Sequence, residues 1–167
     1  MKTLIVGKIH LLGEKINTDL HCSTKYLPGK DSAYAAKHAF DGVSPGFATS
    51  FATGDVIVAG SDFGINSSRE QAIQVLRLMG VAAVIAPSFG RQFFRNAINN
   101  GLSLVEAPIE GLSQGDEVSL DLQEGQLKVE KKSLVRSFSA LPTFAQAILN
   151  AGGLIPFLEA HPDWSIH

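Results

Sequence analysis

Apolar residues in the middle of the chain gather into short continuous runs that are separated by amphipathic stretches. Runs at 55–59 and 81–86 have the length of buried strands and are bounded by turn-forming residues. The segment between them has apolar residues at the spacing of one helix face: Ala72, Val75, Leu76 and Met79. We therefore expect a helix over 68–79, ended by Gly80, between two parallel neighbouring strands with a right-handed crossover.

The pattern continues past this unit and then changes. A further helix is expected from Ser88 to Asn100, followed by a strand over 102–106. Residues 117–129 instead alternate apolar and polar positions, which is typical of a β-hairpin. Three shorter signals complete the prediction: a strand at 3–6, a helix at 34–40 and a helix at 143–150.

Residues 7–34 are rich in Gly, Asn, Asp, Ser, Thr and Pro, and we expect them to form mostly loop with a possible short strand. The sequence contains no repeat, low-complexity tract or linker. We therefore predict the fold class α/β, as one domain over residues 1–167 with a parallel βαβ core and an added β-hairpin.

Composition narrows the class of partner. Hydrophobic residues make up 45% of the chain and charged residues 18%, which fits a protein that buries surface against a partner. The net charge of −2, without a basic cluster, argues against nucleic acid. No apolar run is long enough to span a bilayer or to form a signal peptide, so we expect no membrane association and a cytoplasmic location.

We expect no metal site within this chain. The single cysteine, Cys22, cannot hold an iron–sulfur cluster, which takes about four thiolate ligands. The five histidines have no ligand spacing. A lone thiol is usually a small core residue, so we interpret Cys22 as part of the core rather than as a nucleophile.

The clearest chemical signal is the loop that joins the buried run at 55–59 to the helix expected over 68–79. It ends with two overlapping capping-box spacings, Ser67 with Glu70 and Ser68 with Gln71, so the helix is expected to begin here. A helix start is electropositive because its backbone N–H groups are unpaired, and Arg69 adds a fixed positive charge. The loop therefore fits a carboxylate or phosphate, although an ordinary capped helix with a surface arginine has the same pattern.

Three sequence blocks extend this signal: Gly64-x-x-Ser67-Ser68-Arg69-Glu70, Ala86-Pro87-Ser88-Phe89-Gly90-Arg91 and Arg95-Asn96-Ala97-Ile98-Asn99-Asn100-Gly101-Leu102. Together they resemble the small subunits of the isopropylmalate isomerase and homoaconitase group, the swivelling-domain branch of the aconitase superfamily. Gly13–Asp19 and Gly152–Ile155 are similar to further segments of that group, so the resemblance covers nearly the whole chain. It implies a single swivelling β/β/α domain.

The resemblance also implies an activity and a partner. The activity is that of a hydro-lyase, which isomerises a hydroxy di- or tricarboxylate, such as 2- or 3-isopropylmalate in leucine biosynthesis, by dehydration and rehydration. In this group a four-iron–four-sulfur cluster belongs to a separate large subunit, which agrees with a chain that has one cysteine. The implied partner is that cluster-bearing large subunit, in a heterodimer or heterotetramer, and this chain itself binds no cofactor.

By the same resemblance, Ser67 is the base that removes a proton from carbon, as an alkoxide stabilised by the helix start and Arg69. Arg69 would also grip a substrate carboxylate through its planar fork. Four further residues are substrate-binding candidates: Ser68, Asn66, Lys30 and Thr18. The loop Tyr26-Leu27-Pro28-Gly29 is expected to select the distal group of the substrate, and because it lacks an arginine it favours a small or apolar tail.

Departures from the group keep other activities open. Isopropylmalate enzymes usually have Cys-Gly before Ser-Ser-Arg-Glu, whereas this chain has Ile65-Asn66; asparagine tolerates the left-handed backbone that such a turn needs. We interpret Arg91 and Arg95 as structural or partner-facing, and Asp19 as shaping the loop around the site. The alternatives are a homoaconitase, citraconate or dimethylmalate hydratase small subunit, or an inactive anion-binding or regulatory homologue. A nucleotide-binding domain is disfavoured because both phosphate-binding glycine motifs are missing.

Overall fold

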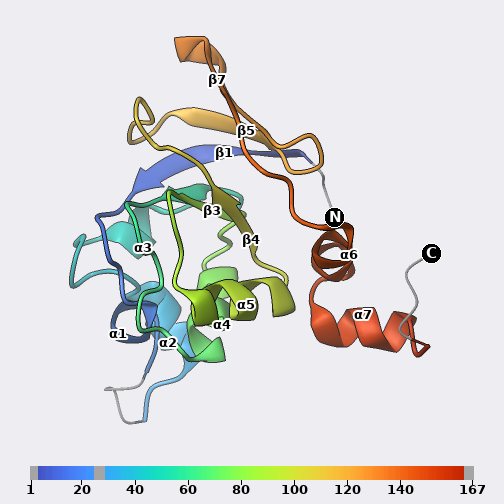
Figure 1. Ribbon diagram of the computed structural model, residues 1–167. Coiled ribbons are helices and arrows are strands. Elements are labelled where there is room, and N and C mark those ends of the chain that lie inside the picture. The colour runs from blue at the N-terminus through green and yellow to red at the C-terminus, as the bar shows by residue number, and fades with distance from the viewer. Residues whose placement is uncertain (1–3, 25–28, 164–167) are drawn as a thin grey trace.

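The computed structural model describes residues 4–24 and 29–163, and within these ranges seven strands form one curled sheet (Figure 1). The strands are β1 (Leu4–Leu11), β2 (Val56–Val58), β3 (Ala83–Ala86), β4 (Ser103–Glu106), β5 (Glu117–Asp121), β6 (Gln126–Val129) and β7 (Leu134–Ser137). Their order across the sheet is β4-β3-β2-β1-β5-β6-β7. Neighbours from β4 to β1 are parallel, and neighbours from β1 to β7 are antiparallel.

Helices connect or follow these strands: α1 (Thr18–His21), α2 (Ser32–Lys37), α3 (Phe47–Ser50), α4 (Glu70–Leu78), α5 (Arg91–Asn99), the 3₁₀ turn η1 (Glu130–Lys132), α6 (Thr143–Ala151) and α7 (Leu154–Ala160). In Figure 1, α1, α2, α4 and α5 lie together below the parallel strands, and α6 and α7 lie at one side. None of the helices in the described ranges is long and apolar enough to cross a membrane.

The molecule has three layers because its parallel strands are apolar on both faces. β2 and β3 are buried at every position, and strands of this kind need cover on both sides. On one face, Ile57 and Val84 pack with the apolar side chains of α4 and α5. On the other face, Ile85 packs with Leu120 and Leu127 of the antiparallel strands. The result is the β/β/α arrangement that the sequence resemblance implied.

The hydrophobic pattern identified the central unit correctly. β2 and β3 are parallel neighbours joined by α4, and β5 and β6 form the expected hairpin. Gly80, at φ 83°, ends α4 in left-handed backbone, as glycine commonly does. The expected apolar stripe faces the core, with Met79 partly buried and three residues fully buried: Ala72, Val75 and Leu76.

Over 7–34 we predicted mostly loop with a possible short strand; a strand is present, but its continuation from β1 and the helix α1 were not predicted. β1 runs on to Leu11 because its first half pairs with β5 and its second half with β2. The same segment also contains the short helix α1. Long-range strand pairing extends β1 into a Gly- and Lys-containing stretch that has little intrinsic strand preference.

Other boundaries also differ from the prediction. The helix expected at 34–40 is α2, which begins at Ser32 under an Asp31 cap and ends at Lys37. Phe40 has φ 64°, which a helix cannot include. The remaining elements, α3, β7 and α7, were not expected from the pattern, since they are short and carry little periodic signal.

Candidate functional site

The carboxyl ends of β1, β2 and β3 meet at one edge of the sheet, and the loops that follow them carry the candidate site. β1 leads to Asn17–Asp19, β2 to Asn66–Arg69 and β3 to Gly90–Gln92. Because the three strands are parallel neighbours, their loops are side by side. Phe63 ties two of them together, since its N–H and C=O both pair with the loop after β3, with N···O distances of 3.1 and 2.8 Å.

Ser67 lies between these loops and is only 2% exposed. Its Oγ accepts the backbone N–H of Thr18 at 2.7 Å and that of Asp19 at 3.3 Å. Oδ1 of Asn17, 3.3 Å away, accepts the hydroxyl proton of Ser67. Two amide donors that converge on one oxygen stabilise negative charge there, so the start of α1 forms an oxyanion site around Ser67.

Asp19 caps the start of α4 from a distant part of the chain. Its buried carboxylate accepts the N–H of Ser68 at 3.1 Å and the N–H of Arg69 at 3.2 Å. A negative charge is favourable at a helix N-terminus because the N–H groups there lack partners within the helix. The two helix starts are therefore capped crosswise, with Ser67 bound to α1 and Asp19 bound to α4.

This arrangement corrects the helix start that the sequence predicted. α4 begins at Glu70, with Arg69 as its N-cap and with no side-chain hydrogen bond from that residue. Ser67 and Ser68 do not cap the helix. The Asp19 carboxylate, 49 to 50 residues away in sequence, accepts the N–H groups of Ser68 and of the N-cap Arg69, immediately before the first turn. The protein's own carboxylate therefore lies at the helix start where the sequence predicted an anion seat.

A hollow of about 260 Å³ opens beside Ser67. It is lined by the 64–67 segment of one loop and by Gly90, Arg91 and Gln92 of the other. The loops approach closely because Gly90 has no side chain; a Cβ there would collide with the carbonyl oxygen of Gly64. Ser67 is therefore buried, yet it borders a space that a small substrate can enter.

Two arginines next to the site have free guanidinium groups. Arg69 and Arg91 are exposed, and neither side chain has a hydrogen bond or ion pair with any described residue. Asn96 of α5 donates to the carbonyl oxygen of Ser68 at 3.2 Å, which fixes α5 against the loop that carries Ser67. The site thus has two cations available for an anionic ligand.

Of the other residues expected at the site, Thr18 is buried and Asn66 is exposed. Thr18 is fully buried, and its Oγ1 has no partner among the described residues, so the residue contributes its backbone N–H to Ser67. Asn66 is exposed and lines the hollow. Its φ of 56° confirms the left-handed turn that the sequence predicted at this position.

The expected specificity loop is described only in part. Tyr26, Leu27 and Pro28 lie outside the described residues, and Gly29 is exposed with φ 75°. Nζ of Lys30 lies 4.5 Å above the ring of Tyr34, and Lys30 does not line the hollow beside Ser67. The structure therefore does not bring Lys30 to this part of the site.

The interpretation of Cys22 as a core residue is confirmed. The side chain is 1% exposed, and burial raises the pKa of the thiol well above its ordinary value. Within 4–24 and 29–163, no group of three or more His, Cys, Asp or Glu residues is arranged to hold a metal ion.

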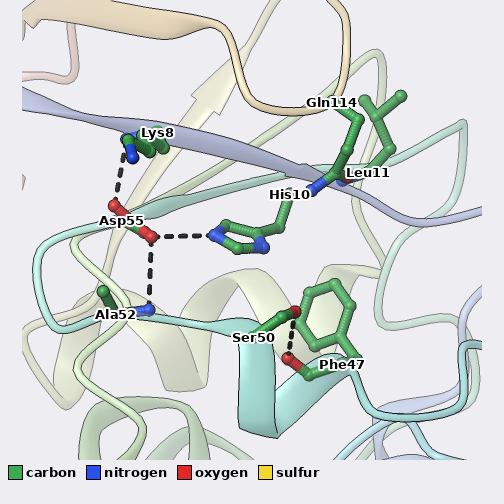
Figure 2. Close-up of polar contacts among 8 residues, drawn as sticks. All are labelled: Lys8, His10, Leu11, Phe47, Ser50, Ala52, Asp55 and Gln114. Atoms are coloured by element: carbon green, nitrogen blue, oxygen red, sulfur yellow. Dashed lines mark hydrogen bonds and ion pairs between the residues drawn. The ribbon is translucent and has the colours of Figure 1, made fainter.

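A second buried polar cluster lies at the opposite, amino end of β2 (Figure 2). Asp55 accepts hydrogen bonds from Nε2 of His10 at 2.8 Å and from the backbone N–H groups of Lys8 at 3.0 Å and Ala52 at 3.2 Å. Burial by itself would raise the pKa of Asp55, but the hydrogen bonds from His10, Lys8 and Ala52 outweigh it and lower the pKa. The sequence analysis did not find this pair.

Asn17, like Gln92, is a residue of the site that the sequence analysis did not single out. It is the N-cap of α1, and its Oδ1 accepts the N–H of Asp19 at 3.0 Å as well as the Ser67 proton. An asparagine before a short polar segment is a recognisable N-cap signal. Its contact with Ser67, 50 residues away, has no local signal.

Comparison with known proteins identifies the class. Residues 24–109 match the family described as the aconitase C-terminal domain, and the chain belongs to this family. The 3-isopropylmalate dehydratase small subunit of Sulfurimonas denitrificans is 41% identical over 159 residues, 95% of each chain. The protein of the same name from Moorella thermoacetica is 40% identical over 165 residues, 98% of this chain and 99% of the relative. A crystal structure of 3-isopropylmalate dehydratase from Methanocaldococcus jannaschii matches with a TM-score of 0.88 at 36% identity and covers 95% of each chain.

Proposed function

We propose that the chain is the small subunit of a hydro-lyase that isomerises a hydroxy dicarboxylate such as 2- or 3-isopropylmalate. Similarity to named small subunits over nearly the full length supports this assignment. The structural observation that carries it is the buried Ser67, whose Oγ accepts two backbone N–H groups beside an open hollow. We treat residues 1–167 as one domain that completes its active site against a partner.

The chemistry requires a strong base. Dehydration breaks a C–H bond next to a carboxylate and the C–O bond on the adjoining carbon, which leaves a C=C bond and water. A serine hydroxyl is a poor base at neutral pH, so its alkoxide needs donors that are already in place. The N–H groups of Thr18 and Asp19 supply them, and Ser67 takes the proton from carbon. In the rehydration step the Ser67 hydroxyl gives its proton to the carbon that lost the hydroxyl group, and the hydroxyl group of water adds to the carbon that lost the proton, which yields the isomer.

The substrate is an anion, and Arg69 is the residue we assign to it. Its guanidinium is exposed and unpaired among the described residues, and it lies two positions after the base. A planar guanidinium binds a carboxylate through two parallel hydrogen bonds. Ser68 belongs to the same loop and is a further candidate for contact with the substrate. We assign selection of the substrate's distal group to Lys30 and to the loop at 26–29.

The described residues do not fit an iron–sulfur cluster. Cys22 is the only cysteine of the chain and is buried, and such a cluster takes about four thiolate ligands. Departure of the hydroxyl group therefore depends on groups outside this chain. We place a four-iron–four-sulfur cluster on a separate large subunit, with which this chain forms a heterodimer or heterotetramer in the cytoplasm.

The test is an anaerobic hydration assay. The chain is mixed with the large subunit from the same organism and offered isopropylmalate, citraconate, dimethylmalate and homoaconitate in parallel. We expect formation of a complex and turnover of isopropylmalate. Turnover of another acid in place of isopropylmalate would correct the substrate, and an assembled complex with an intact cluster that turns over none of them would contradict the function.

A further inference from the structure

Asn66 has an unusual backbone for a residue with a side chain. Its φ of 56° lies in the left-handed region, which asparagine tolerates better than most residues with a side chain but which glycine adopts with less strain. The side chain is exposed, has no hydrogen bond with any described residue, and lines the hollow beside Ser67. A glycine would form this turn more easily, so the asparagine side chain calls for a role beyond the turn itself.

The opposite wall of the hollow comes from the start of α5. Arg91 and Gln92 line it there, across from the loop that holds Asn66 and Ser67. Arg91 also borders a neighbouring hollow that contains Glu106, yet the two side chains form no ion pair. The guanidinium is therefore not neutralised by the described part of the protein.

The polar side chains that line the hollow all carry hydrogen-bond donors. Besides Ser67 they are Asn66, Arg91 and Gln92: the guanidinium of Arg91 is a donor only, and the amides of Asn66 and Gln92 carry an NH2 group beside an acceptor oxygen. An ionised carboxylate is an acceptor only, so it matches a wall of donors, and an arginine adds opposite charge. An apolar tail would instead leave these groups without water or partners, at a cost in free energy.

We propose that Asn66, Arg91 and Gln92 form a carboxylate subsite next to Ser67, separate from the carboxylate position assigned to Arg69. This inference rests on the proposed function and names the substrate class more closely. A dicarboxylate whose proton is removed by Ser67 places one carboxylate at Arg69 and the other in the hollow. Its third substituent, apolar or not, then lies outside the hollow.

The decisive variant is Asn66→Gly, and the chain offers a matched control. Ser133 is also an exposed non-glycine residue in left-handed backbone, with φ 49°, but it lies in the turn before β7. Replacing either residue by glycine removes the same backbone strain, so both variants are expected to keep or raise the melting temperature. Only Asn66→Gly is expected to weaken substrate binding.

The measurement uses the assembled complex of this chain with its large subunit. We expect Asn66→Gly to raise KM for isopropylmalate about tenfold, with kcat within about twofold, because a hydrogen bond made equally in ground and transition states is lost. Ser133→Gly should match the wild type. Arg91→Gln should raise KM further, and its effect should shrink at high salt because it removes a charge.

Calorimetric titration separates this inference from the proposed function. The wild-type complex and both glycine variants are titrated with 2-isopropylmalate and with each of its two monoamides. We expect Asn66→Gly to weaken the dicarboxylate and to leave unchanged the affinity of the monoamide that lacks the carboxylate bound in the hollow. Equal affinities of wild type and Asn66→Gly for the dicarboxylate, or no binding by the wild type, would overturn the subsite. Binding with the expected pattern but without turnover would refute the hydro-lyase function and keep the subsite.

Discussion

Two buried polar clusters join the same two parts of the chain at opposite ends of β2. At the amino end, Asp55 binds His10 and the backbone of Lys8, and at the carboxyl end the Ser67 loop binds Asn17–Asp19. Both clusters link the β1 segment to the β2 segment across more than 40 residues. They differ in what is bound: a carboxylate surrounded by donors at one end, and a neutral hydroxyl held by two amides at the other.

This difference indicates a structural role for the Asp55 cluster and a chemical role for the Ser67 cluster. The Asp55 carboxylate is ionised and already has three donors, so it has little capacity left for a ligand. The Ser67 oxygen accepts two backbone N–H groups that favour its anion, and it borders an open hollow. In open parallel sheets ligands bind at the carboxyl ends of the strands, and the Ser67 cluster lies at that end. We therefore expect variants of the two clusters to differ both in the property that they change, turnover or stability, and in the size of that change.

The largest expected effect is that of Ser67→Ala on turnover. Removing the base should lower kcat of the reconstituted enzyme about 10³-fold, within the range typical of a lost general base. Assembly with the large subunit should persist, because only the N–H of Thr18 loses its acceptor, at a cost of about 1–3 kcal/mol in the free energy of unfolding, while the N–H of Asp19 keeps Oδ1 of Asn17. Steady-state kinetics and gel filtration of the complex measure both quantities.

Ser103→Ala is the matched control for this variant. Ser103 is 3% exposed, nearly as buried as Ser67, but it lies in β4. Its replacement should leave kcat within about twofold of the wild type, since buried serines without a catalytic contact affect mainly stability. A kcat for Ser67→Ala within about tenfold of the wild type would remove Ser67 from the role of base.

The next largest effect is that of Asp19→Ala on stability. The change leaves the N–H groups of Ser68 and Arg69 without their acceptor, and hydrogen bonds to a charged group are worth about 1.5–3 kcal/mol each. We expect the free energy of unfolding, measured in urea, to fall by about 3 kcal/mol.

Asp31→Ala gives the comparison for a purely local cap. Asp31 accepts the N–H of Tyr34 at the start of α2, and loss of such a cap costs about 1 kcal/mol. If Asp19→Ala costs no more than Asp31→Ala, the crosswise capping of α1 and α4 adds nothing to an ordinary helix cap.

Asp19 and Asp31 show how far helix caps can be predicted from the sequence. Asp31 lies next to the helix that it caps, so its signal is local, like that of the apolar runs of β2 and β3, although the sequence analysis placed the helix at 34–40 and did not identify this cap. Asp19 binds Arg69, the N-cap of α4, which lies 50 residues later, so local spacing favoured Ser67 and Ser68 for that position. A capping box is a preference of the isolated segment, and a carboxylate supplied by the tertiary fold overrides it.

Some features of the candidate site could likewise be predicted from the sequence, and others could not. The left-handed turn at Asn66 followed from the chemistry of asparagine, and Ser67 and Arg69 followed from a family resemblance that the relatives confirm. The oxyanion donors could not be predicted, because they are backbone N–H groups of Thr18 and Asp19, whose positions depend on the pairing of β1 with β2. The His10–Asp55 pair depends on the same pairing.

The smallest expected effect is a change in acid stability at the amino end of β2. The pKa of Asp55 is lowered in the folded protein, so its ionised form stabilises the fold above its unfolded pKa of about 3.8, and this stabilisation is lost as pH falls through the folded pKa. Asp55→Asn should therefore cost about 1 kcal/mol at pH 7 and flatten the loss of stability between about pH 5 and pH 2.

Urea unfolding at several pH values measures this slope, and Asp116→Asn is the control. The pKa of Asp116 is also lowered, through its hydrogen bond with Lys132, whose Nζ lies 2.5 Å away. That carboxylate is near the surface, so its contribution should disappear in high salt, whereas the contribution of the buried Asp55 should persist. If Asp55→Asn loses stability in acid as steeply as the wild type, the Asp55 cluster is not the structural counterpart of the Ser67 site. The charge that stabilises the β1–β2 pairing would then have to lie elsewhere.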